Sequence, residues 1–162
     1  VWAPWGKLFA SAIINEHNLR FDIKLRLGED TVFCWEYLSY CPDVTVLASN
    51  LYNYSGVWGG GAKYALTLEE QKYKLSRFLV TLHNICLTSP IKTNVGIDYA
   101  KGILLQYARC DFQEQKEIMR VIAVEYNPKF DVDIKGGILW KTVFCLIRAR
   151  CYRIASVFMK YL

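Results

Sequence analysis

Residues 66–162 contain four segments in which apolar side chains recur every three or four positions, the spacing of one face of an α-helix. Thr67 and Glu70 form a capping-box pair at the first start, and Asp111 with Glu114 forms a similar pair at the third. Helix-start and helix-stop residues predict helices over residues 67–89, 94–109, 111–127 and 138–162. A chain with this pattern is expected to form a helical bundle over its last hundred residues.

The residues before this bundle have a different pattern, in which short helices and strands alternate. The spacing predicts a helix from Lys7 to Asn18, and a second helix opened by Gly28 and ended by Pro42. Extended segments are predicted over residues 20–23, 44–47 and 51–54, the last two as paired strands. The chain is therefore expected to divide into residues 1–56, a flexible Gly-rich loop over 57–65, and a helical region over 66–162.

Composition excludes several classes of protein. Apolar residues make up 53% and charged residues 22% of the 162 positions, as in a globular domain. The net charge is +5 and the basic residues are scattered until the final helix, so no nucleic-acid partner is expected. Six cysteines without a C-x-x-C pair predict buried, reduced thiols in a cytoplasmic protein. The first residue is Val1 and the start is apolar and aromatic, so we expect a piece of a larger protein.

The final predicted helix, residues 138–162, combines an apolar face with five basic residues. Its apolar face is formed by Trp140, Val143, Phe144, Ile147, Cys151, Ile154 and Phe158. Five cations exclude an ordinary transmembrane span. Two interpretations remain open: peripheral contact with an anionic membrane, or packing of the apolar face on the neighbouring helices with the cations in solvent.

Residues 28–31, Gly-Glu-Asp-Thr, are the most informative short motif. Carboxylates are favoured at a helix start by the exposed backbone N–H groups and by the helix dipole, so the motif is explained structurally without any function. A carboxylate fixed at a helix tip is also suited to remove a proton from an incoming hydroxyl. The motif alone leaves both interpretations open.

Four segments occur in an order and spacing that resemble bacterial family-2 glycosyltransferases, which have the GT-A fold. They are residues 3–9 (APWGKLF), 18–22 (NLRFD), 27–33 (LGEDTVF) and 51–54 (LYNY). The resemblance covers residues 1–56 and implies the acceptor-side end of a GT-A catalytic domain. The expected fold class is mainly α with a small β component: the C-terminal portion of a GT-A type α/β domain followed by a helical bundle.

The resemblance implies an inverting transfer from a nucleotide-sugar donor to a glycan or lipid-linked acceptor, for a bacterial surface polysaccharide or lipid-linked glycan. Asp30 matches the family's general base, and Glu29 beside it would orient the acceptor. Trp5 and Lys7 match the W-x-K-L element and would line the acceptor or diphosphate side of the cleft. The location implied is cytoplasmic, peripheral at the inner face of the membrane. The donor sugar, acceptor, linkage and oligomeric state stay open.

The family also uses a divalent metal, Mg²⁺ or Mn²⁺, held by a D-x-D motif in an upstream half. We expect that half to lie outside this chain, so these residues alone are expected to be inactive and to hold no metal. Asp131 and Asp133 match the letters of the motif, but the family's motif ends a strand before the Lys-Leu-Phe helix, whereas these residues lie in a Pro/Lys/Gly loop far after it. The alternative function is a non-catalytic helical module that docks on a membrane surface or a partner protein.

Overall fold

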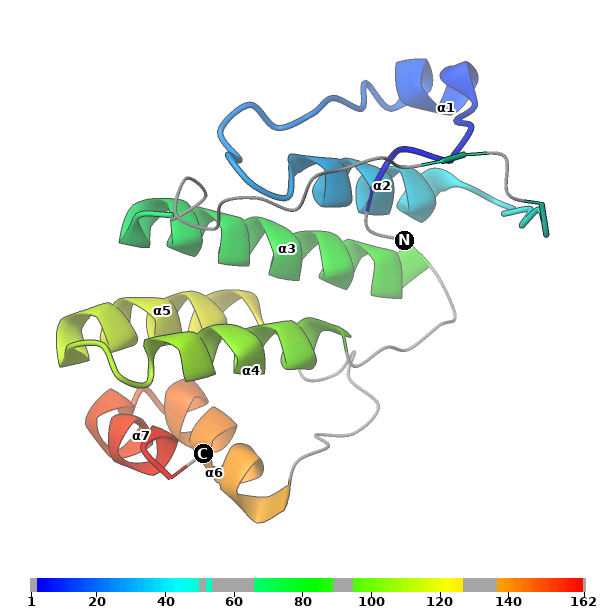
Figure 1. The fold of residues 1–162 in the computed structure, drawn as a ribbon. Helices are drawn as coiled ribbons and strands as arrows, with labels where there is room; N and C mark the ends of the chain where they lie inside the picture. The colour runs from blue at the N-terminus through cyan, green and yellow to red at the C-terminus, as the bar shows by residue number, and fades with distance from the viewer. Residues whose placement is uncertain (1–2, 50–51, 54–65, 89–94, 127–136, 162) are drawn as a thin grey trace.

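The computed structural model describes residues 3–49, 52–53, 66–88, 95–126 and 137–161. These residues form seven helices: α1 (Ser11–Glu16), α2 (Glu29–Tyr40), α3 (Leu68–Thr88), α4 (Val95–Tyr107), α5 (Phe112–Glu125), α6 (Gly137–Arg148) and α7 (Tyr152–Met159). The helices are stacked in successive layers (Figure 1). Helices α1 and α2 lie at one end, α3 lies under α2, α4 and α5 follow, and α6 and α7 lie at the opposite end.

Two of the helix starts predicted from the sequence are confirmed in atomic detail. At the start of α3, the Thr67 N–H donates to Glu70 Oε2 at 2.8 Å, and the Glu70 N–H donates to Thr67 Oγ1 at 3.3 Å. At the start of α5, the Asp111 carboxylate accepts from the N–H groups of Gln113 and Glu114. Both arrangements satisfy N–H groups that a helix leaves unpaired in its first turn.

The main hydrophobic core lies between α3 and the four helices that follow it. Leu75, Ile97, Ile118 and Ile147 come from four different helices and are fully buried in it. A second, smaller cluster joins α2 to α3 through Val32, Trp35, Phe78 and Leu82, together with Leu25. Burial of this apolar surface is the main favourable contribution to folding, and it places the start of α2 firmly against α3.

The expected GT-A type α/β component is wrong for the described residues, which contain no strand. Val44–Leu47 forms no regular structure and three of its side chains are well exposed. Of the second predicted strand only Tyr52 and Asn53 lie within the described residues, and neither is in a strand. A β-rich run becomes a strand only when a neighbouring strand accepts its hydrogen bonds, and the described part of the chain offers it no such neighbour.

The single long helix predicted over residues 138–162 is also wrong, because the chain breaks between α6 and α7. Arg150 has a left-handed backbone with φ 58°. The Arg150 N–H donates to the Ile147 carbonyl at 3.0 Å and the Cys151 N–H donates to the Leu146 carbonyl at 2.8 Å. This hydrogen-bond pattern ends a helix, and it normally uses glycine at the left-handed position. Because arginine occupies that position here, the break could not be predicted from a glycine signal.

Candidate active site at the start of α2

Gly28 fixes where α2 begins and how closely it approaches α3. Its φ of +92° is in the left-handed region. A Cβ added at Gly28 would lie 2.7 Å from Phe78 Cζ and 3.4 Å from Lys74 Cε. Both the backbone conformation and the close approach require glycine. The two acidic residues that follow are therefore held at a defined position on the surface of α3.

Asp30 and Glu29 occupy the first turn of α2, and both are partly buried. Asp30 Oδ1 accepts from the Thr31 N–H at 2.7 Å and lies 3.3 Å from Thr31 Oγ1. The contact fixes the direction of the Asp30 carboxylate and places negative charge where the helix dipole favours it. The predicted position of Asp30 at a helix tip is confirmed, whereas its role as a base stays a prediction.

Two lysines share this region with the two acids. Burial lowers the pKa of Lys74 on α3, and the charges of Asp30 and Glu29 raise it in part. Burial raises the pKa of the Cys34 thiol, the positive charge of Lys7 lowers it, and the negative charge of Asp30 raises it. Lys7 and Asp30, which are 23 positions apart in the chain, thus both act electrostatically on Cys34. Glu29 and Asp30 share one helix turn beside Lys74, a residue that sequence reasoning missed.

Trp5 lies two residues before Lys7, and 47% of its surface is exposed. The Gly6 position between them is close to Tyr52, because a Cβ added there would lie 3.6 Å from Tyr52 Cβ. Residues 3–9 therefore meet residue 52 of the LYNY segment. The role of Trp5 in lining the cleft stays a prediction.

Aromatic side chains hold the remaining segments of the resemblance together. Phe33 on α2 stacks on Phe21 with ring centroids 4.4 Å apart and meets the edge of Phe9 at 5.6 Å. Phe9 also packs against Tyr37 at 4.9 Å. Each pair adds to the hydrophobic gain of burial through favourable ring geometry. Segments 3–9, 18–22 and 27–33 thus form one packed unit around α2.

An open groove of about 470 Å³ lies between the loop that precedes α2, the C-terminal half of α2, and α3. It is lined by His17, Asn18, Leu19, Arg20, Phe21, Asp22, Ile23, Glu36, Ser39, Tyr40, Arg77, Thr81 and Asn84. Stacked rings of His17 and Tyr40, 3.8 Å apart, form one wall. Thr81 is 1% exposed, and its Oγ1 has no hydrogen-bond partner in the part of the chain described. An aromatic wall with several polar groups suits a polyhydroxylated ligand.

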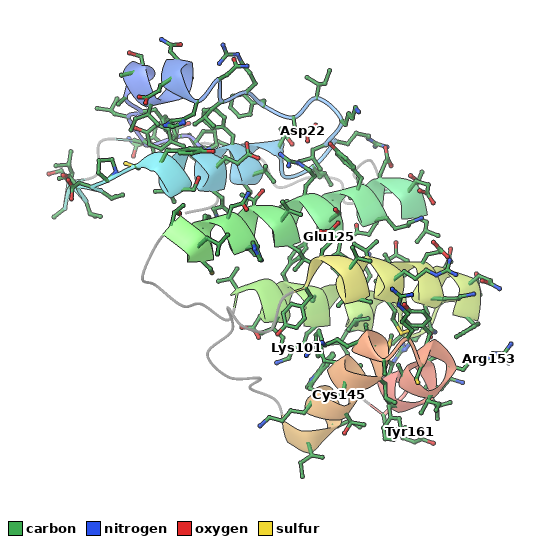
Figure 2. All side chains as sticks on the ribbon, turned by 180° about the vertical axis from the view of Figure 1, so that it is seen from behind. Asp22, Lys101, Glu125, Cys145, Arg153 and Tyr161 are labelled. Atoms are coloured by element: carbon green, nitrogen blue, oxygen red, sulfur yellow. The ribbon has the colours of Figure 1, made fainter. Side chains whose placement is uncertain are left out.

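A charged network closes the floor of this groove. Arg77 on α3 donates from Nε to Asp22 Oδ2 at 3.1 Å and from its terminal nitrogen to Glu36 Oε1 at 2.6 Å. Tyr73 donates its hydroxyl proton to Asp22 Oδ2 at 2.8 Å, and the Lys24 N–H donates to Oδ1. Figure 2 shows Asp22 in the loop above α3. The network joins the loop, α2 and α3.

The network also shifts the pKa values of its members. Burial raises the pKa of Asp22. The hydrogen bonds from Tyr73 and Lys24 and the charge of Arg77 together lower that pKa by more than burial raises it, so the net pKa is below its ordinary value. Burial lowers the pKa of Arg77, and Glu36 and Asp22 raise it to a net increase. Sequence reasoning missed this cluster because its members come from residues up to 55 positions apart, with no local motif.

The other chemical predictions gain no new site. Among the described residues, no group of three His, Cys, Asp or Glu side chains is placed to hold a metal ion. Asp131 and Asp133 lie outside the described residues. None of the six cysteines forms a disulfide, but only Cys34 is buried and Cys145 is exposed, so the prediction of buried thiols holds for one.

Comparison with models of known families, with curated proteins and with solved structures finds no match to this chain. The proposed relationship to family-2 glycosyltransferases therefore depends only on the resemblance of the four segments. Within the described residues, no helix has both the length and the apolar character needed to cross a membrane.

Proposed function

We propose that this chain supplies the acceptor side of an inverting nucleotide-sugar glycosyltransferase that builds a bacterial surface polysaccharide or lipid-linked glycan. The observation that carries the proposal is the fixed position of Glu29 and Asp30 in the first turn of α2, which Gly28 brings close to Phe78 and Lys74 of α3. The proposal rests on these residues and requires no sheet within the chain. Six cysteines that form no disulfide support a cytoplasmic location, where thiols stay reduced.

Asp30 acts as the general base in the proposed reaction. Its carboxylate accepts the proton of an acceptor hydroxyl while that oxygen attacks the anomeric carbon of the donor sugar. The bond from the anomeric carbon to the nucleoside diphosphate breaks on the opposite face, which inverts the configuration. Glu29 orients the acceptor, and the ammonium groups of Lys7 and Lys74 offset negative charge near the reacting groups. Such charges act strongly where water is partly excluded.

The groove along α2 is the proposed binding region for the acceptor. Its stacked His17 and Tyr40 rings offer an apolar platform for a sugar face, and Asn84 supplies a polar side chain on the groove lining. Glu36 and Tyr40 on the groove wall lie on the same helix as Asp30. A glycan extending along α2 would span from the groove to the helix start.

The nucleotide-sugar donor and a divalent metal, Mg²⁺ or Mn²⁺, complete the activity that the resemblance implies. The described residues offer no ligand group for that metal. We assign it no ligands and no step in the mechanism of this chain.

The test compares Asp30→Asn with Glu29→Gln in the intact protein, with release of nucleoside diphosphate from a panel of nucleotide-sugars as the readout. Asp30→Asn should lower kcat by about 10²- to 10⁴-fold, the usual worth of a general base. Glu29→Gln removes the neighbouring charge at the same helix turn and should have a smaller effect. Circular dichroism should show unchanged helix content in both variants. More than about a tenth of the wild-type rate in Asp30→Asn would reject Asp30 as the base.

A further inference from the structure

Residues 137–161, which contain α6 and α7, account for the whole net charge of the chain. The full chain has 20 Lys and Arg against 15 Asp and Glu. Residues 137–161 contain five basic residues and no acidic one, so the rest has 15 of each and is neutral. The five are Lys141, Arg148, Arg150, Arg153 and Lys160, and all are exposed. A positive field is therefore concentrated at one end of the molecule.

The inner face of this helix pair is buried in the hydrophobic core. Val143, Phe144 and Ile147 of α6 and Ala155 and Met159 of α7 are each at most 2% exposed. This packing supports the interpretation in which the apolar face predicted for the final helix covers its neighbours. The apolar face of α6 packs in the core and is not available to a membrane. A membrane contact would therefore involve the outer face of α7.

The outer face of α7 carries a second row of apolar side chains beside the cations. Ile154 is 51% and Val157 52% exposed, and their spacing of three residues places them on one face of α7. Tyr161, which is 77% exposed, follows just after the C-terminal end of the helix. Figure 2 shows Arg153 and Tyr161 at the edge of the molecule. Arg153 also lies over the Phe112 ring, with its guanidinium carbon 5.4 Å from the centroid.

We propose that the outer face of α7, with the basic residues of the α6–α7 pair around it, docks on the surface of an anionic lipid membrane. The row of Ile154, Val157 and Tyr161 enters the boundary between headgroups and acyl chains, where a tyrosine ring is favourably placed. The cations contact lipid phosphates. Residues 137–161 contain no carboxylate that would repel those phosphates.

The exposed apolar side chains favour lipid over other anionic partners. A nucleic-acid backbone would use the cations but would leave the aligned Ile154 and Val157 in water, whereas a bilayer buries them. Docking at this end also leaves the start of α2 uncovered, because α2 and α7 lie in layers at opposite ends of the stack (Figure 1). The proposal does not depend on the proposed glycosyl transfer, and its test measures no transfer.

The experiment is co-sedimentation of the full chain with vesicles of phosphatidylcholine, with and without phosphatidylserine, over a series of salt concentrations. Binding should require phosphatidylserine and should weaken as salt rises, because exposed charges are screened. Arg150→Gln with Arg153→Gln removes two cations worth about 1 kcal/mol each near a membrane, so affinity should fall about 30-fold. Ile154→Ser with Val157→Ser should also weaken binding, with the salt dependence retained.

The matched control removes two exposed cations elsewhere, by Lys24→Gln with Arg120→Gln, and gives the same net charge. It should bind phosphatidylserine vesicles as the wild type does. Equal weakening by both charge pairs would show a response to net charge alone and would overturn the proposal. Lack of binding at low salt, or unchanged binding of the Ile154 and Val157 double variant, would overturn it as well.

Discussion

The two ends of this molecule bury their apolar side chains to very different extents. Around α3–α7 the core is continuous, and isoleucines such as Ile97 and Ile118 are 0% exposed. In the layer formed by residues 3–53, by contrast, α1 has no fully buried residue. Nine of the sixteen large apolar side chains that are well exposed in the described residues lie in this layer, among them Leu8 at 99% and Ile23 at 95%.

This difference indicates that the helical stack closes its own hydrophobic core, whereas the N-terminal layer leaves more of its large apolar side chains exposed. Isolated exposed apolar residues are common on proteins, but a concentration of them marks an interaction surface. The same layer carries Asp30 and the groove. The chemistry proposed above thus lies in the part of the chain that is least closed by its own core.

The largest expected effect separates the two regions by one identical substitution. Ile118→Ala in the core should cost about 2–5 kcal/mol of unfolding free energy, because it loses buried methyl groups and leaves a cavity. Ile23→Ala removes the same atoms from a side chain that is 95% exposed and should change stability by less than about 0.5 kcal/mol. Urea denaturation followed by circular dichroism measures both. Similar losses in the two variants would show that the N-terminal layer is as well packed as the stack.

The junction between the regions can be tested at Gly28. Gly28→Ala must adopt a left-handed backbone and bring its Cβ against the Phe78 ring, and should destabilise by about 1–3 kcal/mol. Gly102→Ala is the matched control, because Gly102 lies inside α4 with no atom within 4 Å of an added Cβ. That substitution should stabilise by about 0.5–1 kcal/mol through higher helix propensity. A neutral Gly28→Ala would mean that α2 does not depend on this close contact.

The same contrast explains which features the sequence could predict. Helix starts with a local signal, such as Thr67 with Glu70 and Asp111 with Glu114, are confirmed because the interacting groups lie within one turn. The first helix was expected over residues 7–18 and is shortened to Ser11–Glu16. The predicted strand over residues 44–47 failed because its hydrogen-bond partner is not a local property of the sequence.

The candidate site also contains some residues with a local sequence signal and others that depend on distant partners. The position of Asp30 at the tip of a helix followed from a four-residue motif and is confirmed. Lys74, 44 residues further along, and the pair of Asp22 with Arg77 come together only through packing of α2 on α3. No spacing rule connects such residues, so neither could be predicted from the sequence.

A smaller effect is expected from the Asp22 network that ties the N-terminal layer to α3. The pKa of Asp22 is lowered on folding, so its contribution to stability is full above the unfolded value, about 3.9, and is lost as pH falls through the folded value. Asp22→Asn should cost about 1 kcal/mol near pH 7, since the carboxylate is partly exposed and screened. In urea titrations at successive pH values, wild type should lose this difference below about pH 4. A constant difference across that range would exclude a depressed Asp22 pKa.

The smallest effect on stability, yet the sharpest test of the comparison, comes from the exposed side chains of the N-terminal layer. Leu8→Gln with Val46→Thr should change the free energy of unfolding by less than about 0.5 kcal/mol, because these side chains are 99% and 87% exposed. Binding of a hydrophobic dye, and self-association in sedimentation velocity, should be lower than in the wild type, because the exposed apolar surface of the layer is reduced. Val124→Thr, at a position 74% exposed on α5, is the control within the closed stack and should leave both readouts unchanged. A clear loss of stability in the Leu8 and Val46 variant would instead show that these side chains are covered in solution by the chain itself.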